Sequence, residues 1–203
     1  MSSELATQAL PGTPPAPDRR TRGRVRRRDA VYAAAIGLFV ERGYDNTTMD
    51  EIAERADVAR ATVFNHFQRK AAFLDEWSSR RRDRALGAVR AEEHHALREV
   101  LQRYMVELGN LSSATRPETV ALMGAAVHNT NVLGDPPLAH EIAKLLTDSG
   151  ELAESVDPEL AGLLLATGYF ATLTRWIDTD PPFDLTEQLL RMLDLVLTGV
   201  LPA

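Results

Sequence analysis

A stretch of seven residues carries the side chains in this chain that are best suited to reading a nucleic acid. An asparagine can bridge the edge of adenine, and an arginine can grip guanine or a phosphate. We expect Arg60, Thr62, Asn65 and His66 to project from one short helix without filling its apolar face. Such a face would bind bases and phosphates in a DNA groove, and the alternative is a solvated polar face on a small helical unit.

Three predicted helices position these side chains. Apolar residues at helical spacing predict a first helix over 26–42, ended by Gly43 in the left-handed conformation. Thr48, with a glutamate three residues later, predicts a capping box at the start of a second, short helix. A tight turn at Asp57 leads to a third helix over 59–67. Two short helices joined in this way form a helix-turn-helix, whose second helix enters the major groove.

Residues 24–70 resemble the DNA-binding head of the TetR family of bacterial transcriptional regulators. The segments that carry the resemblance are Leu38–Tyr44, Thr47–Ala53 and Val58–Phe67, followed by Lys70. The resemblance implies an all-α fold, a DNA operator, a C-terminal domain that binds a small-molecule effector, and a homodimer.

The predicted DNA contacts combine the helical face with what the resemblance implies. The free backbone N–H groups at the helix start near Thr48 attract a phosphate, and Lys70 matches the family's phosphate-contacting lysine. Two residues depart from the family: Phe64 lacks the hydroxyl of the usual tyrosine, and Ala59 replaces a common capping residue. The full predicted set is Thr48, Arg60, Thr62, Phe64, Asn65, His66 and Lys70.

Charge is divided unevenly along the chain. Residues 1–70 carry 12 Lys+Arg against 9 Asp+Glu, whereas residues 71–203 carry 11 against 20. Seven of the basic residues lie between Arg19 and Arg28. We expect a disordered Pro/Arg-rich leader over 1–23 and a flexible basic arm that reaches phosphates or the minor groove. The alternative is a solvated charge run. The arm residues are Arg24, Arg26 and Arg27.

The acidic remainder, residues 71–203, is predicted to be a helical effector-binding and dimerisation domain. Its predicted helices span 71–90, 94–110, 118–130, 137–148, 158–177 and 185–201, with Asp135, Asp157 and Asp184 placed to cap the last three. Large or polar residues on these helices are candidates for an effector pocket, although such residues also fill cores. They are Trp77, Tyr104, Met105, Leu108, Met123, His128, Asn129, Tyr169 and Trp176.

Two apolar stripes on the last two predicted helices favour a four-helix dimer interface, in agreement with the resemblance. The alternative is that both stripes are buried within one subunit. The predicted interface residues are Leu164, Gly168, Ala171, Leu189, Leu193 and Val196.

Several classes of protein are disfavoured. The chain has no cysteine, no glycine-rich phosphate loop, and no nucleophile elbow, so we expect no enzyme, no cofactor and no metal. The cluster Glu92-Glu93-His94-His95 lacks the i, i+4 spacing of a helical metal site. The longest uncharged apolar-leaning stretch, 160–174, is shorter than the ~20 residues that span a bilayer. Without an apolar segment after the N-terminus, a cytoplasmic protein is expected.

The sequence therefore predicts a homodimeric DNA-binding regulator, a repressor that a small, mostly apolar effector releases from a palindromic operator. The alternative is a ligand-sensing or protein-interaction module with weakened DNA binding. Charge replacement at Arg60 and Lys70 distinguishes the two, since it abolishes DNA binding in the first while leaving the dimer intact.

Overall fold

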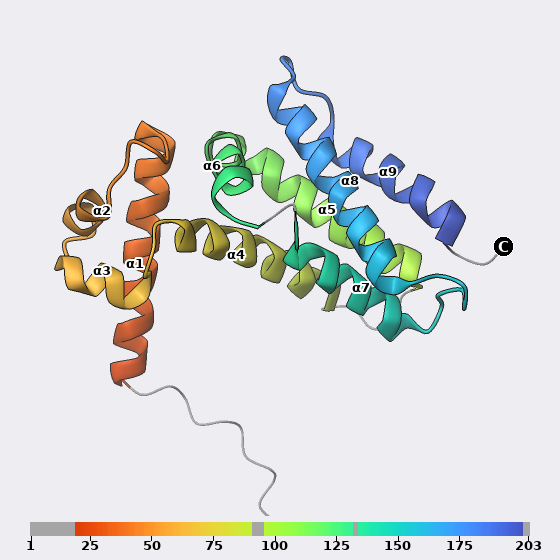
Figure 1. Cartoon of the computed structure of the whole chain (residues 1–203), viewed down its shortest axis with the longest axis horizontal. Coiled ribbons are helices and arrows are strands. Elements are labelled where there is room, and N and C mark those ends of the chain that lie inside the picture. Colours follow the sequence, from red (N-terminus) through yellow and green to blue (C-terminus); the bar gives the residue numbers. More distant parts are fainter. Residues whose placement is uncertain (1–18, 91–95, 132–133, 201–203) are drawn as a thin grey trace, which may run out of the picture.

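The computed structural model describes residues 19–90, 96–131 and 134–200, and within these ranges every regular element is a helix (Figure 1). The predicted all-α class is confirmed. The helices are α1 (Arg19–Arg42), α2 (Met49–Arg55), α3 (Arg60–His66), α4 (Ala71–Arg90), α5 (Leu97–Ala114), α6 (Arg116–Asn129), α7 (Pro137–Ser149), α8 (Pro158–Asp178) and α9 (Leu185–Val200).

Helix boundaries after the head lie close to those predicted, and two of the three predicted caps form. The carboxylates of Asp157 and Asp184 each accept a hydrogen bond of 2.9 Å, from the backbone N–H of Glu159 and Glu187 respectively. The prediction for Asp135 is wrong: α7 begins at Pro137 as expected, but its N-cap residue is Pro136, and no side chain caps this helix.

The arginine run is helical. Helix α1 begins at Arg19, seven residues before the predicted start, so the flexible arm and the leader boundary at residue 23 are wrong for residues 19–28. Arginine is a good helix former, but a run whose one large apolar residue is Val25 has no periodic stripe by which a pattern could reveal the helix. Residues 1–18 of the predicted leader lie outside the described residues.

Helices α1, α2 and α3 form a head whose centre is a cluster of aromatic rings. The Phe39 ring lies 5.0 Å from that of Tyr44 and 6.0 Å from that of Phe73, and Phe67 stacks on Phe73 at 4.0 Å between centroids. Phe73 belongs to the first turn of α4 and is fully buried. The boundary predicted at residue 70 therefore falls inside a packed unit, and α4 starts within the head.

From the head, α4 runs across to a body built from α5 to α9 (Figure 1). Helix α8 packs between α7 and α9, and it is the one described helix long and apolar enough to cross a membrane by length and composition. Eight of its residues are buried, as expected for the core helix of a folded domain. The head and the body share one continuous apolar core.

Candidate nucleic-acid interface

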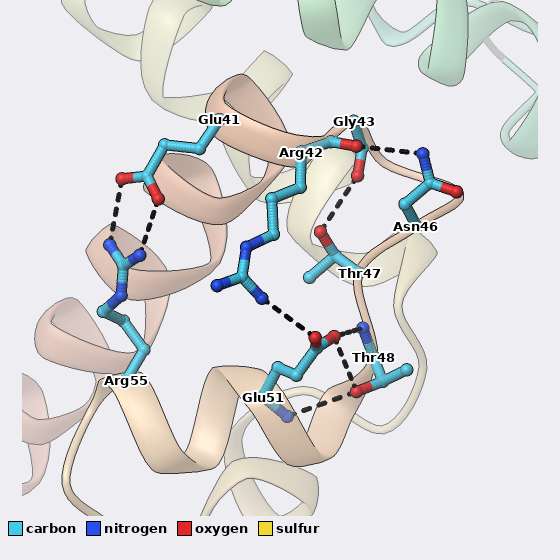
Figure 2. Close-up of polar contacts among 8 residues, drawn as sticks. All are labelled: Glu41, Arg42, Gly43, Asn46, Thr47, Thr48, Glu51 and Arg55. Carbon is cyan, nitrogen blue, oxygen red and sulfur yellow. Dashed lines mark hydrogen bonds and ion pairs between the residues drawn. The ribbon is translucent and has the colours of Figure 1, made fainter.

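The turn between α1 and α2 is fixed by polar contacts to the backbone (Figure 2). Gly43 has φ +87°, in the left-handed region expected of a helix C-cap. The Thr47 hydroxyl donates to the Gly43 carbonyl at 2.9 Å, and the Asn46 amide donates to the Arg42 carbonyl at 3.0 Å. Asp57 also has a positive φ, of 50°, so the predicted tight turn before α3 is confirmed.

The capping box predicted at the start of α2 is present. The Glu51 backbone N–H donates to the Thr48 hydroxyl at 3.2 Å, while the Glu51 carboxylate accepts from the Thr48 N–H at 2.8 Å and from its hydroxyl at 2.9 Å (Figure 2). The Thr48 N–H lowers the pKa of Glu51 below its usual range. The Thr48 N–H, one of the groups at this helix start that were expected to attract a phosphate, thus already donates to the Glu51 carboxylate. In the free head, Thr48 is a helix cap.

Two ion pairs brace α2 against α1 (Figure 2). Arg55 donates to both carboxylate oxygens of Glu41, at 3.0 and 2.6 Å, and Arg42 donates to Glu51 at 3.0 Å. The hydrogen bond from Arg55 is the main cause that lowers the pKa of Glu41. Both pairs are largely exposed, so each contributes little to stability.

Helix α3 turns Val63 into the core and presents its polar residues outward. Asn65 and Arg60 are exposed, and Thr62, Phe64 and His66 are partly exposed. In the free head the Arg60 guanidinium pairs with Asp50 at 3.0 Å and lies 5.4 Å from the centre of the Phe64 ring. All five residues of α3 that were predicted to contact DNA are therefore accessible to solvent in the free head.

Ala59, at the N-cap of α3, makes no side-chain hydrogen bond to the helix, as predicted. A seven-residue helix gains little stability from its own backbone bonds. Its position must come from contacts with the rest of the head.

Lys70 acts differently in the free head from its predicted role. Its ammonium donates to the backbone carbonyls of Tyr44 at 2.7 Å and Thr47 at 3.0 Å, and lies 4.2 Å from the centre of the Tyr44 ring. These contacts tie the α1–α2 turn to the start of α4. The phosphate contact implied by the resemblance would require Lys70 to leave these carbonyls or to share its charge with them.

The basic part of α1 runs beside α3. Arg24, Arg26 and Arg27 are exposed. Burial lowers the pKa of His66, and the positive charges of Arg24, Arg28 and Arg27 lower it further, which places them next to the C-terminal end of α3. Arginines of α1 therefore lie close to the end of α3 that carries His66.

Two residues of this region were missed by the sequence analysis. Arg28 donates to the His66 backbone carbonyl at 3.0 Å and pairs with Glu76 of α4 at 2.7 Å. A signal was present, since Arg28 precedes the buried residues Val31 and Ala35 by three and seven positions and so lies on the inward face of α1. No sequence pattern indicated Glu76.

In the body, four predicted pocket residues do line one cavity. Trp77, Leu108, Met123 and Tyr169 surround a void of about 20 Å³. This volume has room for one water molecule, which is far below the several hundred Å³ of a ligand site. A second cavity of about 350 Å³ lies between α4, α6 and α7, and the two share Ser78 and Arg82 in their walls.

The polar wall shared by these cavities is linked to a further predicted residue, Tyr104, which itself lines neither cavity. Arg82 pairs with Glu141 at 2.8 Å and donates to the Ser78 hydroxyl at 2.7 Å. The Tyr104 hydroxyl donates to the other Glu141 oxygen at 2.7 Å. Burial, followed by the Glu141 charge, raises the pKa of Tyr104 well above its usual range, so this hydroxyl stays a donor.

Four other predicted pocket residues lie elsewhere. His128 and Asn129 are exposed and bond back to their own helix, at the carbonyls of Gly124 and Ala125, so their assignment to a pocket is wrong. Polar residues at a helix end satisfy its last carbonyls more readily than they line a cavity. The other two, Met105 and Trp176, are buried in the core and line neither cavity.

The predicted dimer residues divide into two groups. Leu189 and Leu193 are fully buried within the chain, so their placement at an interface with a second copy is wrong. Helix α9 has one strong apolar face, and α5 and α8 of the same chain cover it. Gly168 permits the close approach of α8 to α9, because a Cβ there would lie 2.7 Å from the Met192 sulfur.

The remaining predicted interface residues are accessible. Leu164 and Ala171 are exposed on α8, and Val196 is partly buried on α9. The other exposed leucines of α8 and α9 are Leu160, Leu163 and Leu195, none of which is in the predicted interface set.

A helix-turn-helix with an accessible polar helix, flanked by a basic helix and joined to a separate helical body, defines a DNA-binding transcriptional regulator. Residues 31–77 match the family described as "Bacterial regulatory proteins, tetR family". Across 87% of this chain and 96% of the other, the structure is similar to that of Thermus thermophilus FadR, a TetR-family transcriptional repressor in complex with lauroyl-CoA, with 29% identity and a TM-score of 0.71.

Two further proteins are similar to this chain over most of their length. The probable acrEF/envCD operon repressor of Escherichia coli is 22% identical over 86% of this chain and 87% of its own. SmeT, the repressor of the Stenotrophomonas maltophilia multidrug efflux pump SmeDEF, shares the fold with a TM-score of 0.67 at 21% identity, over 86% of this chain and 90% of its own. The chain belongs to the TetR family of transcriptional regulators.

Proposed function

We propose that the protein is a homodimeric repressor that binds a palindromic operator through α3 and is released by a small, mostly apolar effector. The accessible polar side chains of α3 carry the proposal, because Asn65 and Arg60 are exposed on the second helix of the helix-turn-helix, and among the described residues Arg60 is held there only through a surface ion pair with Asp50 and the Phe64 ring. Arg60 is assigned to guanine or phosphate and Asn65 to adenine. Thr62, Phe64 and His66 are assigned to the bases and sugar-phosphate backbone beside them.

The arginines of α1 are assigned to phosphates flanking the site that α3 reads. Arg24, Arg26 and Arg27 are exposed on a helix that lies beside α3, so their charges are held in place rather than carried on a mobile segment. Fixed cations lose less conformational freedom on binding than a flexible arm does.

A second copy would place two α3 helices about 34 Å apart, one turn of DNA. The exposed leucines of α8 and α9 support a dimer through this face, since a row of large apolar side chains in water indicates an interaction surface. Leu164→Glu should then give a monomer in sedimentation velocity, whereas Leu164→Ala should weaken the dimer only partly. A Leu164→Glu protein that remains dimeric would place the interface elsewhere.

An effector would occupy the two cavities beside α4 after they merge. Trp77, Met123 and Tyr169 supply apolar lining, and lauroyl-CoA in the FadR relative is a ligand with a long apolar part. A thermal-shift screen of apolar compounds, with lauroyl-CoA included, tests this step. A screen without any binder would count against a mostly apolar effector.

The function is proposed to be regulatory and cytoplasmic, without a catalytic step. Among the described residues, no group of three or more His, Cys, Asp or Glu could hold a metal. The Glu92–His95 cluster lies outside the described residues.

The decisive experiment is salt-dependent binding of the purified protein to its own upstream promoter fragment and to a scrambled fragment. Selective binding to the promoter, with an affinity that falls steeply with salt, is the expected result. Arg60→Gln should remove most of the selectivity while leaving the dimer intact. Equal, weak binding to both fragments, and to every fragment in a genome-wide selection, would favour a sensing module without DNA binding.

A further inference from the structure

Arg28 of α1 contacts three different parts of the head–body junction with one guanidinium. One of its terminal nitrogens donates to the His66 carbonyl at 3.0 Å, and the other pairs with Glu76 of α4 at 2.7 Å. The guanidinium carbon lies 4.5 Å from the centre of the Phe67 ring. Arg28 therefore joins α1, the end of α3 and α4.

The contact with His66 lies at the C-terminal end of α3, where backbone carbonyls lack helical partners. A cation stabilises this end of a helix. The N-terminal end of α3 has no side-chain cap, since Ala59 stands there. The short helix is therefore held at its C-terminal end by a residue from another helix.

The guanidinium of Arg28 is also held firmly from the α4 side. Glu76 accepts from Arg80 at 2.9 Å, and Arg80 pairs in turn with Asp29 at 2.6 Å, so two arginines and two acids link α1 to α4. Burial alone would raise the pKa of Glu76, but the hydrogen bonds from Arg28 and Arg80 outweigh it and the pKa is lowered. Glu76 thus stays charged at neutral pH and keeps its hold on Arg28.

Helix α4 connects this junction to the body cavity. Trp77, the residue after Glu76, donates to the Glu118 carboxylate of α6 at 2.6 Å and lines the inner void. A movement of α4 at the cavity would therefore carry Glu76 with it and, through their ion pair, Arg28.

We infer that Arg28, although it lies in the arginine run, is a positioning residue: with Glu76 it sets the orientation of α3 and is the link through which α4 controls DNA binding. The inference rests on the proposed DNA-reading role of α3. Substitution of Arg28 should therefore affect DNA binding differently from the loss of a phosphate contact, because both terminal nitrogens of Arg28 bond to groups within the protein.

The sharpest test is Glu76→Gln, because simple electrostatics and the inference predict opposite signs. Removing a negative charge from a protein that binds a polyanion should tighten binding. If Glu76 positions Arg28, operator affinity should instead fall about tenfold, with little change for scrambled DNA. The matched control is Glu41→Gln, which neutralises a carboxylate of α1 that pairs with Arg55 of α2 and should change affinity less than about twofold.

Arg28→Gln gives a second, independent readout. A phosphate ligand lowers the slope of log affinity against log salt by about 0.9 when it is removed. We expect the slope to stay unchanged while operator selectivity falls about tenfold, and Arg28→Lys to restore only part of it. A reduced slope with selectivity intact, or tighter operator binding by Glu76→Gln, would overturn the inference.

Amide hydrogen exchange separates this inference from the proposed function. The Phe67 N–H, which donates to the Val63 carbonyl at 2.8 Å and closes the last turn of α3, should exchange faster in Glu76→Gln than in Glu41→Gln. This result stands even if the wild-type protein binds no DNA fragment, an outcome that would count against the proposed function alone. Equal exchange in both variants would show that Glu76 does not position α3.

Discussion

The head and the body are stabilised in different ways, although they share one apolar core. In the head, α2 and α3 have seven residues each and are held by side chains that bond to backbone groups, such as Lys70 at the α1–α2 turn and Arg28 at the end of α3. In the body, helices of 13 to 21 residues pack through apolar faces. Helices too short to sustain themselves need specific polar contacts, whereas long helices need only a continuous apolar face.

The largest expected effect comes from the ring at which the two regions meet. Phe73→Ala removes the α4 side chain that packs on Phe67 and Phe39 in the head. Truncation of a fully buried phenylalanine costs about 3–5 kcal/mol of unfolding free energy, which urea denaturation measures. We expect operator binding to be lost with it. The half-buried Phe183 provides the control, and a loss for Phe73→Ala no greater than for Phe183→Ala would show that the head does not depend on α4.

A smaller effect is expected from the lysine that holds the α1–α2 turn. Lys70→Met keeps much of the apolar stem but leaves the carbonyls of Tyr44 and Thr47 without their cation, at a cost of about 2 kcal/mol. The matched control is Lys144→Met on α7, since the ammonium of Lys144 pairs with Asp148 on an exposed surface. We expect less than about 0.5 kcal/mol there.

The same variant distinguishes two roles of Lys70 in DNA binding. If it acts only within the head, Lys70→Met should leave the salt slope of operator binding unchanged. If Lys70→Met instead lowers the salt slope by about 0.9 without loss of stability, Lys70 contacts a phosphate, as the resemblance implies.

The sequence predicted the two regions unequally well. In the head, Thr48, Gly43 and Asp57 were placed correctly because caps and tight turns need particular residue types. In the body, helix boundaries were close, but Leu189 and Leu193 were assigned to an interface and are core. An apolar stripe shows which face of a helix is buried and carries no information on whether its partner belongs to the same chain.

The contacts that sequence reasoning missed join residues far apart in the chain. Arg28 and Glu76 are 48 positions apart, and Trp77 and Glu118 are 41. Each pair depends on how α1, α4 and α6 cross, which local spacing does not specify. The helical start of α1 was missed for a different reason, because the arginine-rich first part of this helix has no periodic apolar stripe.

In the body, the hydrogen bond between Tyr104 and Glu141 is a polar contact whose loss should lower the unfolding free energy less than the loss of the Lys70 contacts. Tyr104→Phe removes the hydroxyl that donates to Glu141 and should cost about 1 kcal/mol in urea denaturation. Tyr169→Phe is the control, because its hydroxyl makes no hydrogen bond within the described part of the chain. Equal losses in both variants would mean that the body, unlike the head, gains nothing from this polar contact.

The smallest effect is a pH dependence that the head should show and the body should not. Burial and the charges of Arg24, Arg28 and Arg27 lower the pKa of His66 in the free protein. Nearby DNA phosphates favour the charged imidazole, so the pKa of His66 rises when operator DNA binds. A proton is then taken up on binding, and operator affinity should increase as the pH falls from 7.5 to 6.0, by about two- to threefold.

The stability of the free protein should change with pH in the opposite direction from operator affinity. Because the pKa of His66 is lower in the folded chain than in the unfolded one, the unfolded chain binds the proton more readily once the pH drops below about 6.5, and stability is lost as the pH falls through that range. His66→Gln should remove both effects, whereas His128→Gln, on the exposed end of α6, should leave both in place. A pH dependence of operator affinity that persists in His66→Gln would move its origin away from α3 and onto the other groups that face the DNA.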